Sequence, residues 1–145
     1  MSDALQDMID KQAIIDLTIA YGWLLDHGPR DGLREVFTED AVANFGGELF
    51  EGVDAIIAKV EASLGPLSVS QHIVTNQQVE LAGDEASCRC YVHAQHTKRG
   101  TEGGDNHVIA GRYEDRVVRT AEGWRIAHRR LSVDWTEGNP AVHRR

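Results

Sequence analysis

The sequence predicts an α+β domain in which a cone-shaped, curved antiparallel sheet wraps around a long N-terminal helix. Three observations support this. A proline-free stretch of helical pattern opens the chain, and four long strand-like runs separated by glycine-containing turns fill its second half. No repeat, linker or low-complexity tract divides residues 1–145, so we expect one domain. Helices followed by consecutive antiparallel strands are typical of the α+β class.

Composition is that of an ordinary globular domain, with 41% hydrophobic and 26% charged residues. The sequence contains no apolar run near the roughly 20 residues of a membrane helix. Its first residues are acidic where a signal peptide is basic and then apolar, so we expect a cytoplasmic protein without a membrane partner. The net charge of -8, with no basic stripe, argues against nucleic acid as a partner.

The first half of the chain reads as helices with a short hairpin between them. Residues 2–26 begin with the cap-forming Ser2 and Asp3 and end before Gly28, which predicts one helix. Its apolar residues nearly encircle the axis, so we expect it to be buried between layers. A helical piece over residues 31–37, a hairpin formed by 42–45 and 48–50, and a helix over 53–64 follow.

The second half reads as an antiparallel meander. Strands are predicted over residues 68–81, 86–97, 107–119 and 124–135. The residues after Gly138 show no such pattern, and we expect them to be loosely held. Cys88 and Cys90 lie two apart in a strand, which favours small buried side chains over a disulfide.

Asp26 is the first candidate for chemistry. On a helical wheel it falls in the arc of Ile15, Ile19 and Trp23, so its carboxylate would face apolar surroundings. Such a carboxylate must be paired, hydrogen-bonded or protonated. The alternative is that Asp26 only caps the helix end near Gly28.

His72 is the second candidate. In a strand it shares a face with Ser70, Val74 and Asn76, and it either reaches into a pocket or is a satisfied core residue. His96 falls on the small, apolar face of the next strand, which we expect to line a cavity.

Arg129 is the third candidate, because its predicted face also carries Leu131 and Val133, and a guanidinium there needs an anion. A structural ion pair with Asp115 or Glu114 is the alternative reading. The chain contains no HxH, HExxH or paired-cysteine motif, so we expect no metal.

Five segments, taken in order, resemble one known family: AIIDLTIAYGWLLD, FTEDAVANF, FEGVDAI, QHIVTNQQVEL and GRYEDRVVRTAEGWRIAHRR. The chain is similar to the SnoaL-like branch of the ketosteroid-isomerase and nuclear-transport-factor-like superfamily, whose fold is a cystatin-like α+β barrel. Within that branch it looks most like the enzymes with an Asp–His dyad, which are scytalone dehydratase, bile-acid 7α-dehydratase and hexachlorocyclohexane dehydrochlorinase.

The resemblance implies roles for five residues. Asp26 and His72 fall on the dyad positions, Arg129 on a catalytic arginine, Tyr21 on a catalytic tyrosine and His96 near a second histidine. The dehydrochlorinase has a lysine at the Tyr21 position, which argues against dehalogenation. On an ideal helix Tyr21 and Asp26 point about 140° apart, so both can line one pocket only if the helix bends or ends before Asp26.

We therefore expect a cofactor-independent acid/base enzyme, a dehydratase-type lyase or an isomerase, acting on a hydrophobic alicyclic, steroid-like or polyketide-like small molecule. His72 is the expected base, Asp26 orients it, and Tyr21, His96 or Arg129 donates to the developing oxyanion or leaving hydroxyl. The expected walls of the hydrophobic pocket are Trp23, Phe45, Ile57, Cys88, Val92, Ile109, Tyr113 and Val133.

Two other functions remain open. The chain could bind a small molecule without converting it, or serve as an accessory subunit like the β subunit of ring-hydroxylating dioxygenases. The predicted outer sheet face carries Arg89, Tyr91, His93 and Gln95, which is polar for an obligate hetero-interface. That face suits a homo-oligomer, a trimer or a dimer.

Overall fold

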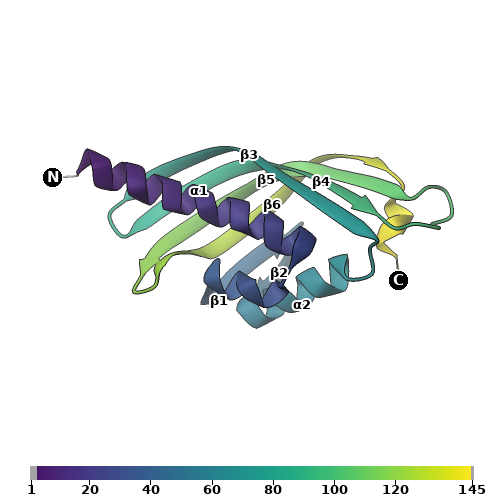
Figure 1. Cartoon of the computed structure of the whole chain (residues 1–145), viewed down its shortest axis with the longest axis horizontal. Helices are drawn as coiled ribbons and strands as arrows, with labels where there is room; N and C mark the ends of the chain where they lie inside the picture. Colours follow the sequence, from purple (N-terminus) through teal and green to yellow (C-terminus); the bar gives the residue numbers. More distant parts are fainter. Residues whose placement is uncertain (1–2, 145) are drawn as a thin grey trace.

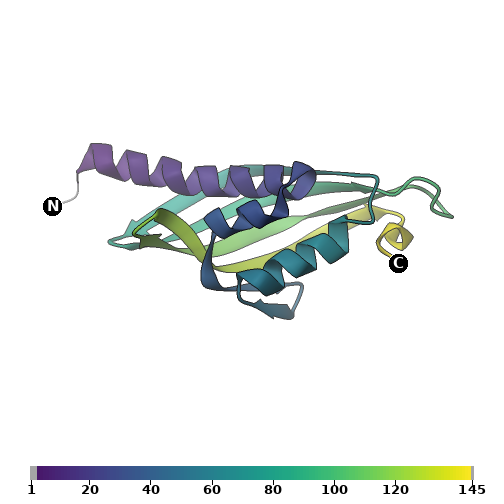
Figure 2. The ribbon, with the colours of Figure 1, turned by 60° about the horizontal axis from the view of Figure 1, so that its bottom comes forward.

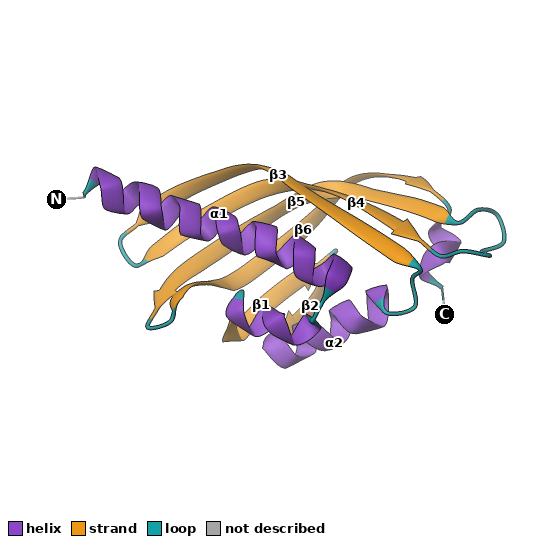
Figure 3. Cartoon of the chain, in the orientation of Figure 1, coloured by secondary structure: helices purple, strands orange, loops and turns teal. Residues whose placement is uncertain are grey.

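The computed structural model describes residues 3–144. The helices are α1 (Ala4–His27) and α2 (Val53–Leu64), with two short 3-10 helices, η1 (Arg30–Glu35) and η2 (Pro140–His143). The strands are β1 (Phe37–Phe45), β2 (Glu48–Glu51), β3 (Val69–Ala82), β4 (Glu85–Thr97), β5 (Asn106–Thr120) and β6 (Gly123–Gly138). The predicted α+β class is confirmed, and the predicted bounds of α2 match those observed (Figure 3).

The six strands form one curved sheet in the order β2-β1-β6-β5-β4-β3. Its neighbours pair antiparallel, except that β1 and β6 run parallel, so the predicted all-antiparallel sheet is corrected at this one pair. The sheet does not close, because β2 and β3 form its two edges. The helix α1 lies along β3 (Figure 1), and α2 lies against β1 and β2 (Figure 2).

Helix α1 is buried on one side only. Asp3 caps its start by accepting a hydrogen bond from the Leu5 amide at 3.0 Å, whereas Ser2 lies outside the described residues. The helix buries Ile14, Tyr21 and Leu25 against the sheet. Its opposite side leaves apolar residues exposed, so the predicted burial between two layers is wrong: Leu5, Met8, Ile9, Ile19 and Trp23. One curved sheet covers the helix from one side, and no second layer covers the other among residues 3–144.

A buried carboxylate fixes the first half of α1 to the β5–β6 hairpin. Asp10 accepts two hydrogen bonds from Arg119, at 2.9 and 3.1 Å, and one from the Trp124 indole at 3.1 Å. The hydrogen bonds from Arg119 lower the pKa of Asp10 to about 2. Asp10 is therefore ionised at neutral pH and holds the helix in its place on the sheet.

Gly22 lets the second half of α1 approach β3 closely. A Cβ at this position would lie 3.3 Å from the His72 carbonyl oxygen and 3.6 Å from Val74. Because residues four apart share one helix face, Asp26 follows Gly22 on the side that faces β3. The close approach therefore brings the Asp26 carboxylate to the strand.

A β-bulge divides β3 into two halves of opposite phase. Residues 76 and 77 are inserted between the pairs Thr75–Tyr91 and Gln78–Arg89, and Asn76 has a positive φ of 59°. Gln77 then reaches Thr18 of α1 with a hydrogen bond of 3.2 Å. The predicted placement of Asn76 on the face of His72 is wrong, because the bulge turns Asn76 to the outer face.

The C-terminal residues are ordered, which contradicts the predicted loose tail. The side chain of Asn139 accepts a hydrogen bond of 3.1 Å from the Ala141 amide and caps η2. Val142 is only 1% exposed, so η2 packs into the fold beside β5 (Figure 3). No helix formed by residues 3–144 is both long and apolar enough to cross a membrane.

The burial of Val142 yields a stability prediction. Val142→Ala removes two buried methylene equivalents, and we expect it to lower the free energy of unfolding by about 1–2 kcal/mol. Val69→Ala, at a site that is 47% exposed, serves as the matched control and should change stability by less than about 0.5 kcal/mol. Urea denaturation measures both. Equal effects of the two substitutions would mean that the C-terminal segment is not packed.

Candidate active site

The structure brings Asp26 and His72 into contact. The Asp26 carboxylate accepts three hydrogen bonds: from the Ser70 hydroxyl at 2.9 Å, from the His72 amide at 2.7 Å and from His72 Nδ1 at 2.7 Å. The side chains of His72 and Asp26 are 6% and 8% exposed. Ser70 was seen in the sequence only as a neighbour of His72, yet its hydroxyl completes the set of donors.

These contacts determine the state of Asp26. Burial is the largest single influence and raises its pKa, but the hydrogen bonds from His72 and Ser70 together lower the pKa below its usual 3.8. Asp26 is therefore ionised at neutral pH. Its contribution to stability is fully present above pH 3.8 and is lost as the pH falls through the lowered folded-state pKa.

The same contacts determine the tautomer of His72. An ionised carboxylate can only accept, so Nδ1 of His72 carries the proton that it donates to Asp26. In the neutral ring Nε2 then holds a free lone pair. Among residues 3–144, Nε2 has no hydrogen-bond partner, and the ring lines a hollow between the helices and the sheet, which we call the chamber. His72 is thus oriented as a base that faces the chamber.

The chamber has a volume of about 470 Å³ and lies between the end of α1, α2, the inner face of the sheet and η2. Three predicted catalytic residues line it, Tyr21, His72 and His96. Three predicted wall residues line it too, Phe45, Ile109 and Tyr113. The remaining lining residues are Leu25, Lys59, Val60, Ala62, Ser63, Leu64, Leu131 and His143. The volume of the chamber lies within the range of small-molecule sites in proteins.

Asp26 stands behind His72 rather than in the chamber wall. Helix α1 continues unbroken to His27, so it neither bends nor ends before Asp26. Tyr21 points to the chamber, whereas Asp26 points to β3 and acts on the chamber through the His72 ring. The 140° between the two side chains expected from helix geometry is therefore compatible with both serving one site.

Arg129 is completely buried and forms the ion pair that the sequence offered as the alternative. Its guanidinium donates two hydrogen bonds of 2.8 Å to Asp115. It lies 4.4 Å from the ring centroid of Tyr21 and 4.0 Å from that of Tyr113. Arg129 thus packs against the faces of both tyrosine rings and does not line the chamber.

The two tyrosines remain protonated donors at neutral pH. Burial raises the pKa of Tyr21, while the Arg129 charge lowers it in part. Burial also raises the pKa of Tyr113 well above its usual value. Their rings pack edge to face with centroids 5.5 Å apart. Tyr113 was predicted as a wall residue, and it lines the chamber beside Tyr21.

His96 presents an acceptor to the chamber. Its Nδ1 lies 3.2 Å from the His107 carbonyl oxygen, so Nδ1 carries the proton and donates it. In the neutral ring Nε2 then has no proton and is an acceptor. Burial, with the nearby His72 and His143 adding to it, lowers the pKa of His96 to about 4. His96 is therefore neutral at pH 7 and accepts hydrogen bonds, which is contrary to its expected role as a donor.

The sequence did not point to His143, which reaches the chamber from η2. Its Nε2 lies 2.9 Å from Nδ1 of His107, and its ring packs 4.8 Å from that of His96. Burial lowers the pKa of His143. Within the described part of the chain, no three His, Cys, Asp or Glu side chains form a group that could hold a metal ion.

Five predicted wall residues lie elsewhere. Trp23 is 66% exposed on the outer side of α1, and Val133 is 46% exposed beside a register shift in the β5–β6 pair. Bulges of this kind change which face a strand residue occupies, so strict alternation fails there. Ile57, Cys88 and Val92 pack in the hydrophobic core instead of lining the chamber. Cys88, like Cys90, is a free buried thiol, as expected.

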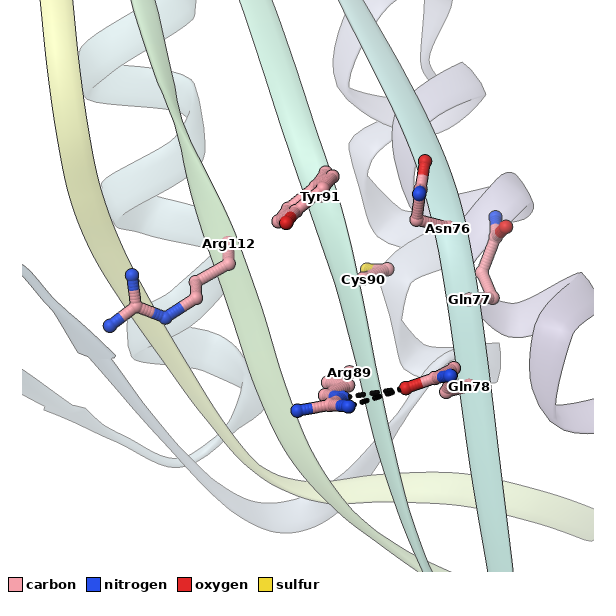
Figure 4. Close-up of a pocket in the computed structure, with 7 residues that line it drawn as sticks. All are labelled: Asn76, Gln77, Gln78, Arg89, Cys90, Tyr91 and Arg112. Atoms are coloured by element: carbon pink, nitrogen blue, oxygen red, sulfur yellow. Dashed lines mark hydrogen bonds between the residues drawn. The ribbon is translucent and has the colours of Figure 1, made fainter.

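A second hollow lies on the outer sheet face and differs in character. Figure 4 shows Asn76 and Gln78 of β3, Arg89 and Tyr91 of β4, and Arg112 of β5 around it. Arg89 donates two hydrogen bonds to the Gln78 side chain, at 2.6 and 2.8 Å. The residues around this hollow include no histidine or carboxylate, so we place the candidate site in the inner chamber.

A family model described as a SnoaL-like domain matches residues 6–130. The chain belongs to the SnoaL-like family. The match confirms the family that the five sequence segments indicated. A Penicillium crustosum protein, terrestric acid biosynthesis cluster protein E, is 29% identical to this SnoaL-like chain over 139 residues, covering 92% of the chain and 88% of that protein.

Two solved structures share the fold of this SnoaL-like chain. The Kfla4162 protein of Kribbella flavida superposes with a TM-score of 0.89 at 27% identity, covering 96% of this chain and 99% of that one. A hexachlorocyclohexane dehydrochlorinase, LinA type 2, superposes with a TM-score of 0.84 at 19% identity, covering 97% and 96%. The second likeness concerns the fold alone.

The tautomer of His96 can be tested by NMR. We expect the His96 ring to be neutral with its proton on Nδ1 at pH 7, and to titrate only as the pH falls toward 4. Long-range ¹H–¹⁵N spectra report both properties, and a His96→Gln variant assigns the signals. A proton on Nε2, or a titration midpoint above pH 6, would contradict the assigned geometry.

Proposed function

We propose that this SnoaL-like protein is a cofactor-independent acid/base enzyme that removes a proton from a hydrophobic ring compound and completes an elimination of water or a double-bond shift. One observation carries the proposal: His72 is held by a buried, ionised Asp26 so that its free Nε2 faces the chamber. A base in this position, oriented and partly desolvated, is what proton abstraction from carbon requires.

In the proposed reaction, Nε2 of His72 takes a proton from the carbon next to a carbonyl, and the electron pair moves onto the carbonyl oxygen. The ionised Asp26 stabilises the imidazolium that forms. The hydroxyls of Tyr21 and Tyr113 donate to the enolate oxygen. Collapse of the enolate then breaks the bond to a hydroxyl on the β-carbon, and this hydroxyl takes the proton from His72 and leaves as water. In a double-bond shift, His72 instead returns the proton to another carbon of a conjugated enolate.

The Arg129–Asp115 pair assists without touching the substrate. Its guanidinium under both tyrosine rings stabilises negative charge near their hydroxyls, which strengthens them as donors. His96, as a neutral acceptor, receives a hydrogen bond from a substrate hydroxyl and so orients the ring. The similarity to a fungal biosynthesis cluster protein supports a substrate from secondary metabolism.

Self-association forms a further part of this proposal. The outer sheet face exposes Ile73, Tyr91 and Trp135 beside the polar residues noted in the sequence. Apolar and aromatic side chains among polar ones suit a contact between copies of the chain. The inner chamber faces away from that surface, so an oligomer leaves the proposed site accessible.

The base can be tested on a panel of hydroxylated cyclic ketones and naphthol-like polyketides. We expect His72→Ala to lower kcat/KM by about 10²- to 10⁴-fold for any compound that is turned over. His128→Ala, which removes a half-buried histidine of β6 that does not line the chamber, is the matched control and should leave the rate unchanged. Circular dichroism verifies folding of both variants. Turnover that survives His72→Ala would exclude His72 as the base.

A further inference from the structure

With its histidines left aside, the chamber carries one formal charge, and it is positive. Of the residues that line it, Lys59 alone is a lysine or arginine, and none is an aspartate or glutamate. The lining histidine His96 is neutral. The chain as a whole has a net charge of -8, so a chamber without a carboxylate departs from the composition of the protein.

Lys59 lies on α2 and has no acidic partner. No carboxylate of residues 3–144 lies within 4.0 Å of its ammonium group, which sits 5.4 Å from the ring centroid of Phe50. The acids that flank it on α2 are already occupied: Asp54 pairs with Arg34, and Glu61 pairs with Arg30. The Lys59 side chain is half-buried, and among the described residues its charge meets the Phe50 ring but no carboxylate.

A second polar group lies on the same wall. Ser63 follows Lys59 by four residues, so the two side chains share one face of α2, and both line the chamber. The rest of that wall is apolar, with Val60, Ala62 and Leu64. The helix α2 thus presents an ammonium and a hydroxyl at one place on an otherwise hydrophobic surface.

We propose that the chamber binds an apolar ring compound that carries a carboxylate, and that Lys59 with Ser63 anchors this carboxylate on the α2 wall. One ammonium neutralises one negative charge, so the arrangement suits a monoanion better than a phosphate. The apolar walls take the ring, and the histidines and tyrosines come from other elements, α1 and the sheet. The inference rests on the proposed function in one respect only: the carbon that loses the proton lies next to His72, away from the carboxylate anchored on the α2 wall.

A matched pair of probes tests the anchor by calorimetry. 1-Naphthylacetic acid and 1-naphthylacetamide have the same shape and differ in charge, and a panel of one-ring and three-ring acid–amide pairs brackets the chamber size. We expect the best-fitting acid to bind about five- to tenfold more tightly than its amide, with the preference reduced at high salt. Lys59→Met should abolish the preference, and Lys59→Arg should retain it.

Lys11→Met is the control, because it removes the same charge at an exposed position on α1. It should preserve the acid preference. Equal binding of acid and amide across the panel, no binding of any acid, or a preference that survives Lys59→Met would each overturn the anchor.

Calorimetry on His72→Ala, combined with the turnover assay of the proposed function, separates the two proposals. Acid-selective binding that persists without any His72-dependent turnover would reject the enzyme and keep the anion site. His72-dependent turnover with equal binding of acids and amides would reject the anion site and keep the enzyme.

Discussion

One buried carboxylate, that of Asp26, constrains the part of the structure that contains the candidate site. Asp26 is 8% exposed, and an ionised group in such a place is tolerated only with a full set of donors. Ser70 and the His72 amide supply two of them from β3, so they fix the end of α1 to the strand. The His72 ring supplies the third, and its orientation toward the chamber follows from that hydrogen bond.

The rest of α1 makes this contact possible. At one end Asp10 is bound by Arg119 and Trp124, and near the other Gly22 allows the helix to lie against the backbone of β3. The helix is therefore held at two separated places, and the space between its end, α2 and the sheet stays open as the chamber. None of the described residues that line the chamber is an aspartate or a glutamate, and Asp26 lies behind the histidine.

The features of the structure that the sequence predicted correctly are those set by local sequence pattern. Capping residues, glycines and alternation indicated the order of helices and strands, and the contact of Asp26 with His72 was anticipated from the family resemblance. The errors came from non-local features. The bulge at Asn76 inverts the strand phase, and the tail is ordered by burial of Val142. Trp23 lies on a helix side that no second layer of residues 3–144 covers. The roles of Lys59 and His143 depend on a chamber shape that one sequence does not specify.

A double-mutant cycle on unfolding free energy measures the central contact without any substrate. Asp26→Ala, His72→Ala and the double variant are compared with the unchanged chain by urea denaturation at pH 7. A hydrogen-bonded, charged pair in this setting predicts a coupling free energy of about 1–3 kcal/mol between the two side chains. Effects that add to within about 0.5 kcal/mol would show that Asp26 does not hold the His72 ring.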